Sequence, residues 1–264
     1  MATDPKIATA PVIEFRDVQF RVAEHIILKH LSFEVRRGET LVLLGRSGSG
    51  KTTALRLVNR LLEPTAGEVC VEGQRTLDQD PIRLRRQIGY VIQESGLFPH
   101  FTVERNIALV PHLENWEKGR VSERVHELLR LFGLEPSQFA RRYPRELSGG
   151  QRQRVGVARA LAADPPILLM DEPFGALDLL TRTKIQREFL ALQHEMHKTI
   201  LFVTHDVGEA LLLGTRIALL EAGELMGVYT PGEFLHSSEP IAAAYVSAFR
   251  AGIVQQSPEK RGVE

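Results

Sequence analysis

The sequence predicts an α/β fold with a parallel-sheet core, an antiparallel β subdomain and an inserted helical subdomain. Three short and almost wholly apolar runs, at 40–45, 167–170 and 200–203, are typical of parallel strands covered on both faces. Helical patterns separate these runs, and strands that alternate with helices indicate an α/β core. The mainly helical stretch from about 94 to 160 interrupts this alternation.

The N-terminal part predicts the antiparallel subdomain. Residues 12–20 alternate crudely between apolar and polar side chains, and 31–35 resembles a second short strand that a turn at 36–38 closes. A further short strand is expected at 67–71.

Helices are expected between the core strands. The first covers 52–62 and stops before Pro64. Ser122 is the expected N-cap of a helix in the inserted stretch, and 179–197 has a helical pattern before the last predicted strand and turn at 216–223. We expect a single domain over residues 1–249, followed by a disordered tail at 250–264, which is rich in Gln, Ser, Pro and charge.

Composition limits the class of function. The 264 residues carry 33 Lys+Arg and 33 Asp+Glu, and this zero net charge argues against a basic nucleic-acid-binding chain or a polybasic membrane binder. The longest apolar run has six residues, whereas a membrane-spanning helix needs roughly 20. The N-terminus lacks an apolar segment of signal-peptide length. Cys70 is the single cysteine and predicts a reducing cytoplasm.

The strand at 40–45 runs into a loop typical of phosphate binding. Residues 45–52, GRSGSGKT, fit the P-loop pattern G-x-x-x-x-G-K-[ST] between a strand and a helix. The glycines let backbone N–H groups face an anion, and the helix points its positive end at the same place. Lys51 can neutralise the β- and γ-phosphates, and the Thr52 hydroxyl can bind Mg²⁺. The residues expected to bind nucleotide here are Gly45, Arg46, Ser47, Gly48, Ser49, Gly50, Lys51, Thr52 and Thr53.

Two adjacent carboxylates, Asp171 and Glu172, end the strand at 167–170. Taken alone, Asp-Glu-Pro fits a strand-end turn equally well. Beside a nucleotide, Asp171 can hold Mg²⁺ through water and Glu172 can polarise an attacking water.

The segment LSGGQRQR at 147–154, followed about twenty residues later by ILLMDEP, resembles the signature of the ATP-binding cassette (ABC) ATPases. Gln93 stands where the Q-loop glutamine of that family belongs, 176–178 matches its D-loop, and His205 in VTHD matches its switch histidine. The resemblance spans about residues 12–225. It implies a RecA-like P-loop NTPase core.

The resemblance implies ATP hydrolysis with Mg²⁺. Glu172 would be the general base, and His205 would hold the γ-phosphate and the water in line. Thr52, Asp171 and Gln93 would organise Mg²⁺ and water. Catalysis would then rest on positioning and charge stabilisation.

A second anion site is expected at the signature. Ser148 is a good N-cap, and Gly149-Gly150 leave backbone N–H groups bare at the start of a helix. In the ABC family this segment meets the ATP of a partner cassette in a head-to-tail dimer, which implies a second copy of this chain as partner. The further nucleotide contacts implied are Ser148, Gly149, Gly150, Gln151 and Asp178.

One position departs from the family pattern. ABC cassettes usually stack adenine on an aromatic side chain just after the first strand, and the matching residue here is Val22. Phe20 or His25 is a candidate substitute, and packing of adenine on aliphatic surface is the alternative.

Residues 94–111 resemble the part of bacterial importer cassettes that receives a coupling helix from the membrane subunit. Leu97, Phe98, Pro99 and Phe101 form an apolar cluster suited to docking, or alternatively to local packing of a loop. The segment GLFPH and its continuation look most like the osmoprotectant (glycine betaine, choline, quaternary amine) branch.

This likeness implies transmembrane permease subunits as partners, indirectly a substrate-binding protein, and no nucleic acid. It places the chain peripherally at the cytoplasmic face of the bacterial inner membrane. The alternatives are a soluble ABC ATPase acting on ribosomes or DNA, and a subunit for another solute or lipid. A third alternative is a degenerate cassette that serves only as a scaffold and does not hydrolyse ATP. The sequence argues against it, because it retains Lys51, Asp171, Glu172 and His205.

Overall fold

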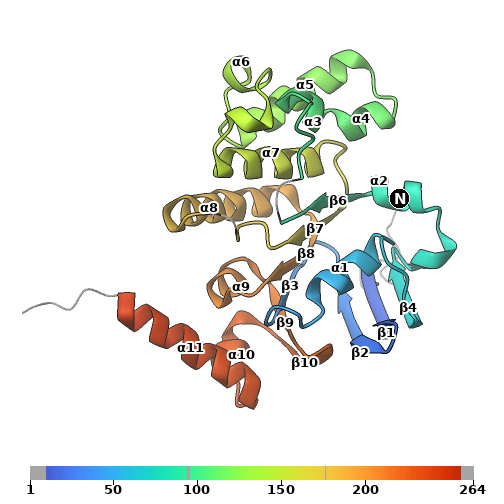
Figure 1. Ribbon diagram of the computed structural model, residues 1–264, viewed down its shortest axis with the longest axis vertical. Helices are drawn as coiled ribbons and strands as arrows, with labels where there is room; N and C mark the ends of the chain where they lie inside the picture. The colour runs from blue at the N-terminus through green and yellow to red at the C-terminus, as the bar shows by residue number, and fades with distance from the viewer. Residues whose placement is uncertain (1–9, 94–95, 176, 257–264) are drawn as a thin grey trace, which may run out of the picture.

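The computed structural model describes residues 10–93, 96–175 and 177–256, and it confirms the predicted mixed α/β architecture (Figure 1). Within these residues, a six-stranded sheet has the order β10-β9-β3-β8-β7-β6, and a four-stranded sheet has the order β2-β1-β4-β5. The strands are β1 (Ile13–Val22), β2 (His25–Val35), β3 (Thr40–Leu44), β4 (Ala66–Val71), β5 (Gln74–Arg75), β6 (Ile88–Val91), β7 (Ile167–Asp171), β8 (Thr199–Thr204), β9 (Arg216–Glu221) and β10 (Glu224–Tyr229).

Strand β3 lies at the centre of the larger sheet. It pairs in parallel with β8 and with β9, so that Val42 stands between Phe202 and Ile217. Every residue of β3 is buried. Leu41 and Leu43 belong to one apolar core, which includes α1 and the antiparallel sheet, whereas Val42 contributes to the other core, which includes the helical layer. Burial on both faces explains the uninterrupted apolar run in the sequence.

The antiparallel sheet is larger than the sequence indicates. Strand β2 starts at His25 rather than at 31, and a tight hairpin pairs it with Val22 of β1. Asp17 and His30 both have positive φ values, 50° and 47°, and the pairing register shifts along the hairpin. Such irregularities break the two-residue alternation on which strand prediction rests.

Helices α3 to α7 follow β6 and precede β7, and they form the layer at the top of Figure 1. The α-helices of the described residues are α1 (Lys51–Val58), α2 (Pro81–Arg86), α3 (Val103–Ile107), α4 (Leu109–Leu113), α5 (Lys118–Leu131), α6 (Pro136–Phe139), α7 (Gly149–Leu161), α8 (Leu179–Met196), α9 (Val207–Leu213), α10 (Pro231–Leu235) and α11 (Pro240–Gln256).

Three helix boundaries differ from prediction. Helix α5 has Glu117, not Ser122, as its N-cap, because the buried Val121 extends its apolar stripe one turn earlier. Helix α1 ends at Val58 instead of 62. Helix α11 continues to Gln256, so the expected tail from 250 overlaps its last turns, and residues 257–264 lie outside the described residues.

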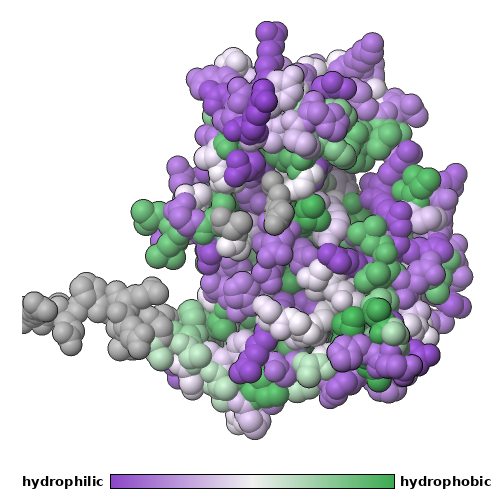
Figure 2. Space-filling model, viewed as in Figure 1, coloured by the Kyte–Doolittle hydropathy of each residue, from purple (hydrophilic) through white to green (hydrophobic). Residues whose placement is uncertain are grey.

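Hydrophilic side chains dominate the face shown in Figure 2, with smaller apolar patches among them. No helix in the described parts of the chain combines the length and apolarity needed to cross a membrane.

Candidate active site

The glycine-rich loop connects β3 to α1, where the sequence places it. Gly48 and Gly50 have φ values of 83° and 99°, a region that glycine enters without a side-chain penalty. Gly50 is also the N-cap of α1, and it provides no side-chain cap. The first N–H groups of α1 are therefore available to an anion.

The Lys51 ammonium lies inside this loop. Its Nζ donates to the carbonyl oxygens of Gly45 and Arg46, each at 2.8 Å, and the residue is 4% exposed. Burial lowers the pKa of Lys51, whereas the Glu172 carboxylate acts to raise it. A phosphate would offer this ammonium stronger, charged acceptors than the two carbonyls.

Thr52 and Asp171 meet although 119 residues separate them in sequence. Thr52 Oγ1 donates to Asp171 Oδ1 at 2.8 Å. Burial raises the pKa of the Asp171 carboxyl, and the hydrogen bond from Thr52 opposes that rise. Within the described residues, no cluster of three or more His, Cys, Asp or Glu side chains suits a metal ion. A hydroxyl and one carboxylate fit Mg²⁺, which commonly completes its shell with water and substrate phosphates.

The Glu172 carboxylate lies between two polar partners. Its Oε2 accepts a hydrogen bond from Gln93 Nε2 at 3.3 Å and lies 3.2 Å from His205 Nδ1. The φ of Glu172 is 44°, a left-handed conformation that costs on the order of 1 kcal/mol for a non-glycine residue. Hydrogen bonds from its N–H to Val203 and from the Gly175 N–H to its carbonyl hold this turn. The fold thus brings together the three residues that the family resemblance assigns to the attacking water.

A cavity of about 500 Å³ opens beside these groups, and its lining includes Thr52, Gln93 and Asp171. Arg56 and Tyr90 also line it, and sequence reasoning missed both. Arg56 follows Thr52 by four residues, which is about one helical turn. This spacing could have predicted that the two side chains lie on the same face of α1. Tyr90 reaches the cavity because β6 pairs with β7, a long-range contact that no local pattern encodes.

The predicted second anion site begins a different helix. Ser148 caps α7: Gln151 N donates to Ser148 Oγ at 3.3 Å, and Ser148 N donates to Gln151 Oε1 at 2.9 Å. Gly149 is exposed and Gly150 is buried. Figure 1 shows α7 in the upper helical layer and α1 beside β3, lower in the view. In the described residues, no hydrogen bond or ion pair joins this cap to the glycine-rich loop.

Asp178 caps α8 and accepts a hydrogen bond from Thr181 N at 3.1 Å. Hydrogen bonding from the Thr181 side chain, and next from this backbone N–H, lowers the pKa of the Asp178 carboxyl. Ala176, the first residue of the predicted D-loop, lies outside the described residues.

The residues considered for adenine stacking lie in the β1–β2 hairpin. Val22 is 56% exposed near the turn and pairs with His25, which is also exposed. Phe20 is 8% exposed and packs in the core beneath the sheet, so its candidacy for adenine stacking is wrong. His25 remains a candidate.

Comparison with known proteins adds to this geometry. The model of the ABC transporter family matches residues 28–175, more than half of the chain. The chain belongs to the ABC transporter family.

Two curated relatives of this ABC chain illustrate the likeness. The choline transport ATP-binding protein OpuBA of Bacillus subtilis (strain 168) is 52% identical over 210 residues, 80% of this chain and 55% of that protein. The glycine betaine uptake system ATP-binding protein YehX of Escherichia coli (strain K12) is 47% identical over 215 residues, 81% of this chain and 70% of that protein. The chain therefore spans little more than half the length of OpuBA.

A solved ABC structure is similar as well. A dimeric ATP-binding cassette in a post-hydrolysis state, bound to ADP and Pi, is 37% identical, with a TM-score of 0.74. The alignment covers 83% of this chain and 98% of that chain.

Proposed function

We propose that this chain is the ATP-hydrolysing subunit of an ABC importer that takes up a quaternary amine osmoprotectant such as glycine betaine or choline. The observation that carries the proposal is the Glu172 carboxylate, held between Gln93 and His205 beside the P-loop. The identities of 52% and 47% to OpuBA and YehX support the solute class.

ATP would bind with its phosphates against the N–H groups of the glycine-rich loop and the first turn of α1. The Lys51 ammonium would leave the carbonyls of Gly45 and Arg46 and turn to the β- and γ-phosphates. Thr52, Asp171 and Gln93 would hold Mg²⁺, which supplies positive charge to the phosphates when bound.

Glu172 would accept a proton from the attacking water, and His205 would orient that water and the γ-phosphate. His205 Nδ1 is 3.2 Å from Glu172 Oε2, which is a direct hydrogen-bond distance. A water molecule placed beside this pair would therefore lie within reach of both groups. Removal of the Glu172 charge would therefore stop the chemical step without removing the phosphate-binding groups.

A second copy would complete the site. The α7 N-terminus at Ser148 offers phosphate-binding N–H groups that no contact joins to the P-loop of its own chain, within the residues described. A head-to-tail dimer would bring this cap, with Gly149, Gly150, Gln151 and Asp178, to the ATP of the partner. The dimeric state of the similar ADP-bound cassette supports this arrangement.

Permease subunits would dock beside the Q-loop, at the cytoplasmic face of the membrane. Phe98 is 41% exposed, and its ring centroid lies 5.3 Å from that of Phe101. A cavity of about 350 Å³, lined in part by Tyr90, Phe98 and Leu109, adjoins this cluster. Such a hollow suits a short apolar helix of a membrane subunit.

The test measures uptake of radiolabelled glycine betaine and choline in cells that lack this chain. Wild-type protein should restore uptake, whereas the Glu172→Gln variant, expressed to the same level, should not. Restoration of uptake by the variant would contradict the proposal. Hydrolysis of ATP by the purified chain without any restored uptake would support the ATPase and reject the osmoprotectant.

A further inference from the structure

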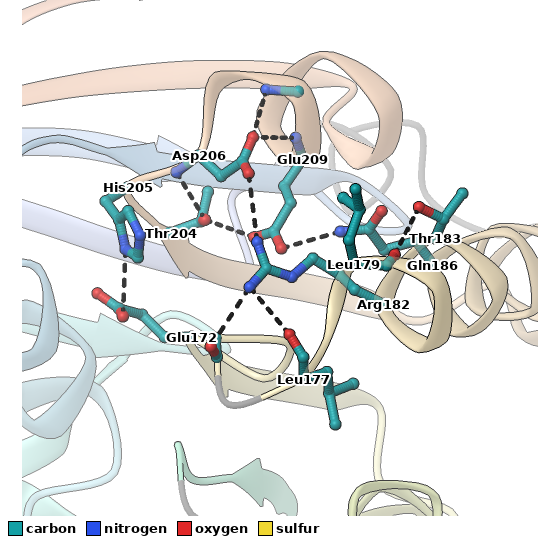
Figure 3. A network of polar contacts seen from close by, with 12 residues as sticks. Glu172, Leu177, Leu179, Arg182, Thr183, Gln186, Thr204, His205, Asp206 and Glu209 are labelled. Carbon is teal, nitrogen blue, oxygen red and sulfur yellow. Dashed lines mark hydrogen bonds and ion pairs between the residues drawn. The ribbon is translucent and has the colours of Figure 1, made fainter. Parts of the chain in front are cut away.

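The guanidinium of Arg182 lies between two loops next to the catalytic residues (Figure 3). Arg182 belongs to the first turn of α8. Its Nη2 donates to the carbonyl oxygen of Leu177 at 3.2 Å and to that of Gly175 at 3.4 Å. Its Nη1 lies 3.7 Å from Asp206 Oδ2. One planar side chain therefore contacts the loop after β7 and the start of α9.

These two loops carry the residues proposed to act on water. The Gly175 N–H donates to the Glu172 carbonyl at 3.1 Å, so the first loop closes directly on Glu172. Asp206 follows His205 in the chain. Through these links, Arg182 connects the backbone around Glu172 to the backbone around His205.

A second side chain of α8 reinforces the connection. Gln186, one turn after Arg182, donates from Nε2 to Glu209 Oε1 at 2.9 Å. Thr204 Oγ1 donates to the other oxygen of Glu209 at 2.5 Å, and Asp206 Oδ1 caps α9 by accepting from its first N–H groups. The segment 204–206 is thus fixed on the side facing α8.

We infer that Arg182 is a positioning residue that sets the separation of Glu172 and His205, an inference that rests on the proposed ATP hydrolysis. Its side chain is only 26% exposed, so these contacts are partly shielded from water. The guanidinium presents donors in a fixed plane and reaches two carbonyls and a carboxylate at once, which the single ammonium of lysine does less well.

The experiment compares Arg182→Ala and Arg182→Lys with the wild-type chain and with Arg187→Ala, a change at an exposed position of the same helix. ATP turnover and the affinity for a fluorescent ATP analogue are measured for each protein. We expect Arg182→Ala to lower kcat by about 10- to 100-fold, because a misplacement of about 1 Å can cost a reaction up to about 100-fold in rate. ATP affinity and KM should stay within about threefold, because the phosphate-binding loop is intact.

Arg182→Lys should recover part of kcat, and added guanidinium ion should partly rescue Arg182→Ala while leaving Arg187→Ala unchanged. These results would support the positioning role. Wild-type kcat in Arg182→Ala would overturn it. Equal losses of kcat, ATP affinity and thermal stability in both Arg182 variants, without guanidinium rescue, would also overturn it by indicating a merely structural role. A wild-type chain that binds ATP without hydrolysing it would overturn the proposed function, and this inference with it.

Discussion

A methyl group at Gly45 would collide with the backbone of the neighbouring strand. A Cβ built there meets the Leu220 carbonyl oxygen well inside contact distance and lies 2.7 Å from Ser49 Oγ. Leu220 is a buried residue of β9 and pairs with Leu225 of β10, so its carbonyl cannot retreat without disturbing the sheet. We therefore expect Gly45→Ala to lower the free energy of unfolding by about 2–3 kcal/mol, within the usual range for overpacking.

That loss corresponds to a decrease of about 4–12 °C in Tm for a chain of this size. ATP affinity should fall as well, since Lys51 donates to the Gly45 carbonyl and would move with the loop. Thermal unfolding by circular dichroism and titration with a fluorescent ATP analogue measure the two effects.

Gly119→Ala is the matched control. Gly119 lies in α5, and a Cβ there has only the Glu117 carboxylate oxygen nearby, at 3.8 Å. Alanine should stabilise this helix by about 0.5 kcal/mol. Opposite shifts in Tm for the two variants would support the steric clash at Gly45. A Gly45→Ala protein with wild-type Tm and wild-type ATP affinity would refute it.

Three further predictions concern hydrogen bonds of the site. Thr52→Val removes the donor to buried Asp171; unfolding free energy should fall by about 1–3 kcal/mol, and half-maximal ATP hydrolysis should require more Mg²⁺ in a titration. Ser148→Ala removes the cap of α7 and should cost about 1 kcal/mol in urea unfolding, whereas Ser148→Thr should retain most of it. Burial raises the pKa of Glu209 above its ordinary 4.5, so above that pH the unfolded chain releases a proton that the folded chain retains. Wild-type stability should therefore fall as the pH rises from about 4.5 toward the folded-state pKa, and Glu209→Gln should flatten this part of the urea-unfolding profile.

The P-loop and the two carboxylates at the end of β7 were predictable because their sequence patterns depend on local order. The loop must directly join a strand to a helix, and Asp171 must end a buried strand, so the sequence spacing carries the geometry. The apolar runs likewise predicted β3 and β8, since strands buried on both faces leave no polar positions.

Long-range contacts could not be predicted from local sequence patterns. Arg182 and Asp206 meet only after α8 packs beside α9, and Tyr90 reaches the cavity beside Thr52 and Gln93 only after β6 pairs with β7. Irregular hairpin geometry hid the first half of β2 because bulges shift the side-chain alternation. Local patterns describe single elements, and these residues act through the contacts between elements.

Glu172 is proposed to activate water for attack on bound ATP. The most direct measurement is phosphate release from ATP by purified Glu172→Gln protein, with ATP binding measured on the same sample. The amide keeps the shape of the side chain and the contacts of the P-loop but cannot accept the proton. We predict nearly abolished turnover with ATP affinity like that of the wild type. Phosphate release at a near wild-type rate would contradict this role of Glu172.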